Sequence, residues 1–160
     1  MSRWTIFLLI ALTALAAAAS QAGNRVFFPD NGFSIAVLEG SPGAATCQPV
    51  AMQLPPTGGF APNVNVQVQP YTDTLQAYVD LSLNQFESMG LEILNDPAPR
   101  GDCSVMEYAG SLQGHPMHWY ATATKHEDHV YLVTACATEA QWSNVSDELK
   151  ACVDSFRVEE

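Results

Sequence analysis

The chain has 160 residues and a formal net charge of −11 at pH 7, from 17 acidic and 6 basic side chains. A surface with this much negative charge repels nucleic-acid phosphates and anionic lipid headgroups. Nucleic-acid binding is therefore not expected, and basic proteins or cations are the favoured partners. The length suits a single domain with a core of useful size.

The N-terminus has the layout of a secretory signal peptide over residues 1–22. Arg3 precedes an apolar run over residues 6–19, and small residues allow cleavage after Ala19 or Ala22. A permanent membrane anchor is the alternative, but half of the run is mostly alanine and no basic stop-transfer cluster follows it. We therefore expect a periplasmic or secreted protein with no stable membrane span after processing, and one domain over residues 23–160.

The first part of that domain has the pattern of strands. Short runs of strand-forming residues, separated by turn residues, predict strands at residues 25–28, 33–38 and 49–54. The sequence "NVNVQVQP" then alternates strictly, so its valines form one face and its amide side chains form the other. We expect a half-buried strand with an accessible binding face formed by Asn63, Asn65 and Gln67.

Two later segments have helical periodicity. Residues 73–89 predict a helix capped by Asp73, and residues 139–156 predict a second, with Thr138 and Gln141 at the spacing of a capping box. Further strands are expected at residues 91–94, 103–112, 117–124 and 130–138. The predicted inward positions are Leu75, Val79, Leu83, Phe86 and Met89 in the first helix, and Trp142, Val145, Leu149, Cys152 or Val153, and Phe156 in the second.

All four histidines lie within "GHPMHWYATATKHEDH", residues 114–129, which raises the question of a metal or catalytic site. A hairpin with Glu127-Asp128 at its tip places His126 opposite His129. His118 is then about 26 Å from His126, at about 3.3 Å per residue. Zinc ligands lie about 2 Å from the ion, so the four histidines cannot share one. A weak transition-metal site at His126 and His129 is one alternative, and a solvated polar turn is the other.

The same register predicts that both faces of this hairpin are largely apolar. His118 is expected to be half-buried and hydrogen-bonded on one of them. A ribbon that is apolar on both sides has to be covered on both sides, and the sequence offers one long helix for each. The prediction is an α+β fold, a three-layer α/β/α sandwich with a mainly antiparallel central sheet flanked by two long helices. One face carries Tyr120, Thr122, Tyr131, Val133 and Ala135, and the other carries Trp119, Ala121, Ala123, Val130, Leu132 and Cys136.

Four cysteines follow the signal peptide, and an even number in an oxidising compartment predicts two disulfides, with three possible pairings. Free buried thiols are the alternative. A Cys136–Cys152 bond would join a strand to the buried side of the last helix, with a contribution of about 3 kcal/mol to stability. Cys47 and Cys103 would then form the second bond.

Motifs of known catalytic chemistry are missing from the sequence. "GSLQG" at residues 110–114 does not have the G-x-S-x-G spacing, and no helix is expected directly after it. P-loop, HExxH and paired-carboxylate motifs do not occur. We expect neither an enzyme nor a bound cofactor.

Three stretches resemble the PsbP-like superfamily, most closely its bacterial DcrB-like envelope branch. They are "GGFAPNVNVQV", "MHWYATATKHEDHVYLVTACAT" and "LKACVDSFRV", and the resemblance extends over roughly residues 25–158. It implies a three-layer α/β/α sandwich used mainly for protein binding. Relatives of this kind include a photosystem extrinsic subunit, a Ran-binding nuclear factor, secretion-effector adaptors and bacterial envelope proteins. No catalytic residues come with the family.

Two functions follow as hypotheses. The first is an exported, non-catalytic module of the bacterial cell envelope that binds another envelope protein or a peptide. The second is a periplasmic protein that binds a small ligand or a transition metal, either at His126 and His129 or in a cavity between helix and sheet.

Overall fold

The computed structural model describes residues 25–28, 33–36 and 47–158, with the backbone alone up to residue 49. The predicted signal peptide therefore lies outside the described residues. The chain divides into two units, Met1–Val37 and Leu38–Glu160. In the first, strands β1 (Arg25–Phe28) and β2 (Phe33–Ala36) form an antiparallel hairpin with Phe28 opposite Phe33.

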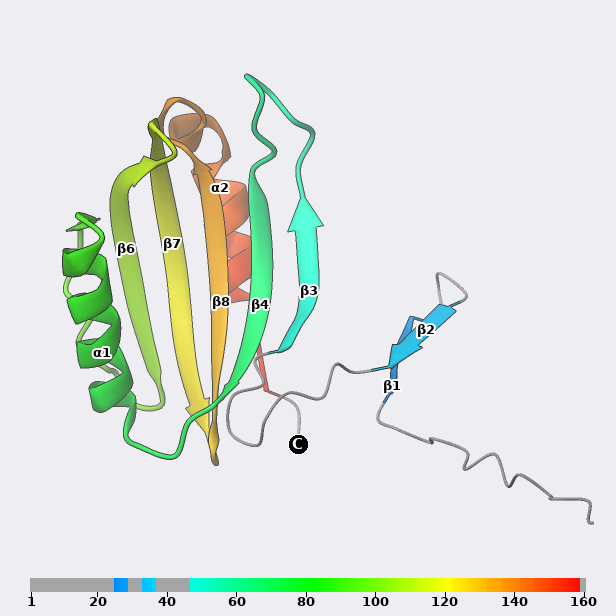
Figure 1. Cartoon of the computed structure of the whole chain (residues 1–160), viewed down its shortest axis with the longest axis vertical. Helices are drawn as coiled ribbons and strands as arrows, with labels where there is room; N and C mark the ends of the chain where they lie inside the picture. The colour runs from blue at the N-terminus through cyan, green and yellow to red at the C-terminus, as the bar shows by residue number, and fades with distance from the viewer. Residues whose placement is uncertain (1–24, 29–32, 37–46, 159–160) are drawn as a thin grey trace, which may run out of the picture. The chain divides into compact units, whose positions relative to one another are not determined.

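The second unit contains an open six-stranded antiparallel sheet and two helices, α1 (Leu75–Ser88) and α2 (Glu139–Asp154). It is an α+β fold, as the sequence predicted. The strand order is β3-β4-β8-β7-β6-β5, so β3 and β5 are the two edges (Figure 1). The strands are β3 (Cys47–Gln53), β4 (Asn63–Pro70), β5 (Glu92–Ile93), β6 (Cys103–Leu112), β7 (His115–His126) and β8 (His129–Thr138).

The β7–β8 hairpin has the predicted register. His126 lies opposite His129, and His118 lies opposite Ala137. On its other side, β7 pairs with β6 through a two-residue turn at Gln113 and Gly114, where φ is positive at both residues. This backbone conformation matches the right-handed twist of the flanking strands, and it extends β7 beyond the predicted residues 117–124.

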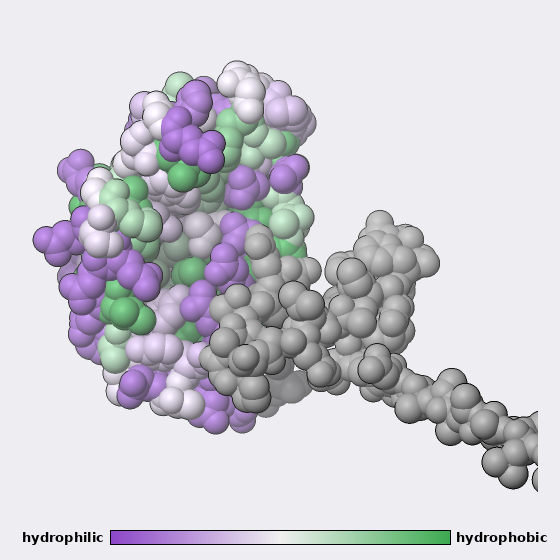
Figure 2. Space-filling view, in the orientation of Figure 1, coloured by the Kyte–Doolittle hydropathy of each residue, from purple (hydrophilic) through white to green (hydrophobic). Residues whose placement is uncertain are grey.

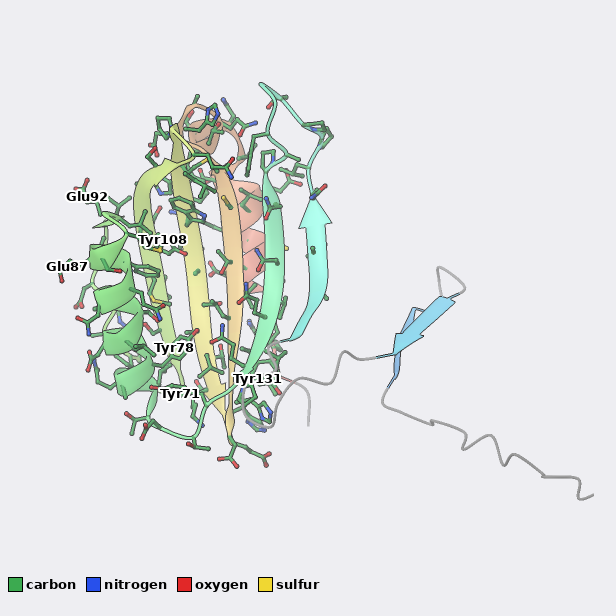
Figure 3. All side chains as sticks on the ribbon, in the orientation of Figure 1. Tyr71, Tyr78, Glu87, Glu92, Tyr108 and Tyr131 are labelled. Carbon is green, nitrogen blue, oxygen red and sulfur yellow. The ribbon has the colours of Figure 1, made fainter. Side chains whose placement is uncertain are left out.

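The first core cluster lies between α1 and β6–β7. Leu75 and Val79 of α1 pack with Met106 of β6 and Ala121 of β7. Figure 3 shows Tyr78 of α1 and Tyr108 of β6 between helix and sheet. The Tyr108 ring stacks on Phe86 at a centroid distance of 4.2 Å, which adds an aromatic contact to the burial.

The second core cluster lies on the other side of the sheet, and it includes the residues of β8 that alternate with those of the first cluster. Val133, Ala135 and Ala137 of β8 pack with Trp142 and Leu149 of α2. Because neighbouring residues in a strand point to opposite sides, one ribbon supplies a separate apolar face to each helix. In Figure 1, α1 lies at the left, beside β6, and α2 lies behind β8 and β4.

The first helix differs from the prediction at both ends. Its N-cap is Thr74 rather than Asp73, and the Thr74 hydroxyl accepts a hydrogen bond from the Ala77 N–H at 3.2 Å. Met89, predicted to face inward, is 63% exposed. The helix ends at Ser88 with Met89 as its C-cap, and the left-handed backbone of Gly90 turns the chain so that Leu91 packs against the cluster instead.

The second helix begins and packs as predicted. The N–H of Thr138 donates to Oε1 of Gln141 at 3.1 Å, as one half of a capping box. Trp142, Leu149 and Val153 are buried. The capping also anchors a loop, because Nε2 of Gln141 donates to the carbonyl oxygens of Thr57 and Phe60.

The burial of Met106 and the exposure of Met89 predict that their substitutions change the free energy of unfolding by different amounts. Met106 is 1% exposed, so Met106→Ala leaves a cavity and should lower the free energy of unfolding by about 2–5 kcal/mol. Met89→Ala is the matched control and should change it by less than about 0.5 kcal/mol, because that side chain is already in water. Urea unfolding of both variants measures the difference, and equal losses would contradict the assignment.

Candidate functional site

The binding row predicted on β4 lies on one face of the sheet. Asn63, Asn65, Gln67 and Gln69 alternate with buried or half-buried valines, and all four are half-buried rather than fully accessible. We call these four residues the amide face. They share their side of the sheet with Val130, Leu132, Thr134 and Cys136 of the neighbouring strand β8.

Hydrogen bonds link part of the amide face to α1. The Tyr78 hydroxyl donates to Oε1 of Gln69 at 3.1 Å, and Nε2 of Gln69 donates to Oε1 of Gln67 at 3.2 Å. Burial raises the pKa of Tyr78 to about 12, so its hydroxyl keeps its proton at neutral pH and acts as the donor. The side chains of Gln67 and Gln69 are therefore held in fixed orientations.

Asn65 has an incomplete set of hydrogen bonds. Its Nδ2 donates to the carbonyl oxygen of Thr134 at 3.4 Å, near the upper limit for such a bond. Its Oδ1 is buried and has no hydrogen-bond partner among the residues that the structure describes. A buried acceptor without a donor costs free energy, so Asn65 is a local weak point in the packing of β4 against β8.

The helix on this side covers only part of the sheet. α1 contacts β5, β6 and β7, and Figure 1 shows β8, β4 and β3 with no helix in front of them. Figure 2 shows this side of the molecule with polar and hydrophobic residues interspersed beside α1. The strip that neither described helix covers is therefore a mixed surface of amides and apolar side chains, of the kind that protein interfaces use.

The opposite face holds a charged network around His118, which is 7% exposed. Its Nε2 lies 3.0 Å from Oε1 of Glu107 on β6, and its Nδ1 lies 3.0 Å from Oε2 of Glu139 on α2. The Trp142 ring stacks on the imidazole at a centroid distance of 4.0 Å. The predicted hydrogen-bonded histidine is present, and it is buried more deeply than expected.

Lys150 completes this network from α2. Its Nζ lies 2.7 Å from Oε1 of Glu107 and 5.0 Å from the centroid of the Tyr120 ring. Burial alone would raise the pKa of the Glu107 carboxyl, but hydrogen bonds from Lys150 and His118 more than offset this and hold it below its usual value. Glu107 is therefore ionised at neutral pH.

The network joins α2 to the sheet. Both ring nitrogens of His118 face carboxylate oxygens, and Trp142 covers one face of the ring. The ring therefore has no free nitrogen to take a proton from a substrate. The partners of His118, which are Glu107, Glu139 and Lys150, were not predicted from the sequence. The turn at Gln113-Gly114 is the signal for one of them, because it sets a register that puts Glu107 on the same face as His118.

The predicted metal residues His126 and His129 face each other at the tip of the β7–β8 hairpin, with His126 exposed and His129 half-buried. Within the part of the chain that the structure describes, no group of three or more His, Cys, Asp or Glu side chains could hold a metal ion. His115 is exposed at the opposite end of β7. The structure thus brings together two histidines at most.

Neither predicted disulfide is present, because Cys103, Cys136 and Cys152 are all free. Cys136 lies opposite Trp119, on the side of the sheet away from α2, so Cys136–Cys152 would have to cross the sheet. Cys47 and Cys103 lie in one row across the sheet, through Val68, Tyr131 and Thr124. Four strand spacings separate them by about 19 Å, far beyond disulfide reach.

One cavity between helix and sheet corresponds to the predicted ligand cavity. It has a volume of about 190 Å³ and lies between the β3–β4 edge and α2. Pockets for drug-sized ligands have volumes of about 300–1,000 Å³. Its lining includes Met52, Leu54, Val64, Leu149 and Cys152.

Comparisons with known proteins give a structural likeness. No family model and no curated protein matches the sequence. The fold is similar to that of PA94, a protein of unknown function from Pseudomonas aeruginosa for which a regulatory role has been suggested. The TM-score is 0.61 over 86% of this chain and 97% of PA94, at 11% sequence identity. The two proteins therefore share a fold.

The charged network predicts a change in stability with pH. The pKa of Glu107 is lower in the folded chain than in the unfolded chain, so its ionised form stabilises the fold above the unfolded pKa. This contribution is lost as the pH falls through the folded pKa. Glu107→Gln should lower the free energy of unfolding by about 1–3 kcal/mol at pH 7, and the difference from wild type should shrink below pH about 4.

Urea unfolding of wild type and variant between pH 7 and pH 3 measures this difference. Glu87→Gln is the matched control, since Glu87 is exposed on α1 and points away from the sheet in Figure 3. A gap between Glu107→Gln and wild type that stays constant over this range would show that the Glu107 charge does not stabilise the fold.

Proposed function

We propose that the protein is an exported, non-catalytic protein-binding module of the bacterial cell envelope, and that the amide face is its binding surface. The observation that carries this proposal is the strip of sheet beside α1 that neither described helix covers, with its row of half-buried amides on β4. Their hydrogen bonds hold Gln67 and Gln69 in fixed orientations, so these amides offer donors and acceptors at fixed positions to a partner.

The fold assignment is a proposal at its finer level. We infer that the sheet and two helices form a three-layer α/β/α sandwich of the PsbP-like superfamily, in its DcrB-like envelope branch. The segregation of the two apolar clusters supports this arrangement, since one contains α1 and the other contains α2. The likeness to PA94 concerns the fold alone.

Export and the lack of catalysis are part of the same proposal. Residues 1–22 carry the pattern of a cleaved signal peptide. No helix among the described residues is long and apolar enough to cross a membrane. The most reactive grouping in the described part of the chain, around His118, has both ring nitrogens engaged by carboxylates.

A photo-crosslinking residue tests the binding surface directly. Placed at Gln67, it should capture a reproducible envelope protein in cells, identified by mass spectrometry. Adding Asn65→Ala should weaken that capture about tenfold, because one hydrogen bond of about 1.4 kcal/mol is lost. The matched control carries the crosslinker at Gln76, an exposed amide on α1 that bonds only to Asp80. Equal capture from both positions, or none from Gln67, would contradict the proposal.

The alternative function, binding of a transition metal, rests on His126 and His129, which lie directly opposite each other. Imidazole nitrogens suit zinc, copper and nickel. This alternative predicts binding heats in calorimetry with these ions that disappear in a His126→Ala/His129→Ala variant. His115→Ala is the control and should keep them. Indistinguishable heats for wild type and the double variant would remove the metal site.

A further inference from the structure

The outer edge of β3 is uncharged in an otherwise acidic chain. β3 has the sequence CQPVAMQ and lies at the end of the sheet. Among the strands that the structure describes, none pairs with its outer side. Edge strands of soluble proteins are usually protected from pairing by charges, proline or a β-bulge. β3 has no charge, and its proline and its register shift lie at its start, at Pro49 and between Cys47 and Val50, so only residues 50–53 remain regular and available.

β3 also exposes apolar side chains. Val50 and Met52 are 40% and 49% exposed, although both lie next to β4, opposite Val66 and Val64. Both point to the side of the sheet that holds α2, since Val64 belongs to the cluster around that helix. An exposed apolar pair on an uncharged edge is a surface for pairing with another strand.

The hydrogen bonds of β3 show which groups are available on that edge. The N–H of Leu54 donates to the carbonyl oxygen of Pro62 at 2.8 Å. Hydrogen-bonded pairs alternate along an antiparallel ladder, so Met52 and Val50 also bond toward β4. The N–H and C=O groups of Ala51 and Gln53 therefore point outward.

We propose that this edge pairs with β3 of a second copy of the chain, antiparallel and centred on Ala51. In this register Ala51 exchanges two backbone hydrogen bonds with the partner's Ala51, as a twofold-symmetric contact requires. Val50 then lies opposite the partner's Met52, and Met52 lies opposite the partner's Val50. The strand is self-complementary because its two exposed apolar residues are spaced symmetrically about the centre.

The distribution of charge favours a second copy of the chain as the partner of the β3 edge. Two copies with a formal charge of −11 each repel one another over most of their surfaces. They can approach at β3 because no charged side chain of that strand meets another. A basic partner strand would find no acidic side chain on β3 to pair with, so the edge suits a neutral, apolar strand such as β3 itself.

The pairing has a consequence that rests on the proposed function. Residues directly opposite each other in an antiparallel pair point to the same side of the sheet. The two amide faces would therefore lie on one side of a continuous sheet, with the two β4 strands three spacings, or about 14 Å, apart. The pair would present a doubled binding surface.

Charge substitutions test the register. Val50→Lys/Met52→Lys places lysines opposite lysines in the pair, and Val50→Glu/Met52→Glu places glutamates opposite glutamates. Wild type should have twice the monomer mass in light scattering after size exclusion, and each variant alone should have the monomer mass. An equimolar mixture of the two variants should recover the doubled mass, since every lysine then faces a glutamate.

The control is Leu112→Lys, a change at an exposed leucine at the end of β6, which should keep the doubled mass. A monomeric wild type at high protein concentration would overturn the proposal. A doubled mass in both variants alone would also overturn it, because the contact would then lie elsewhere. Crosslinking from Gln67 in a monomeric variant should still capture the envelope partner, because the proposed function does not require pairing. The pairing and the proposed function can therefore fail independently.

Discussion

Ten residue pairs join β7 to β8, from Met117 opposite Thr138 to His126 opposite His129. Side chains alternate along each strand, so this one register sends Ala121 and Val130 to one side and Val133 and Ala135 to the other. A shift of one strand by one residue would send its side chains to the opposite faces and disrupt their packing against both helices. The placement of α1, of α2 and of every candidate site in the second unit depends on this pairing.

On the α2 side, the alternation also brings polar groups into the interior. His118 is among the buried residues because its position points toward α2, and burial requires partners for both of its nitrogens. Glu107 and Glu139 supply them from β6 and α2, and Lys150 balances the charge of Glu107. The result is a specific attachment of α2 to the sheet, since a charged network of this kind is satisfied in one arrangement only.

On the α1 side, the sheet is wider than the helix that covers it. α1 contacts β5, β6 and β7, whereas β4 carries a row of half-buried amides on this side, where further apolar side chains would have called for a second helix. The composition of β4 thus explains why this strip stays open. The β3 edge is next to β4, but its exposed Val50 and Met52 point to the α2 side, so self-association and binding at the amide face would use opposite sides of neighbouring strands.

The sequence by itself determined the elements and their faces, because alternation, helical periodicity and turn residues are local signals. It determined the hairpin register, the capping of α2 and the amide row on β4, and it separated the histidines. Only the tertiary structure decided which strands meet across the sheet. Cys136 lies on the side away from Cys152, and Cys47 lies four strands from Cys103. Contacts such as Glu107–Lys150 and the unpartnered oxygen of Asn65 likewise depend on strand order and helix placement. These are non-local properties that spacing along the chain does not encode.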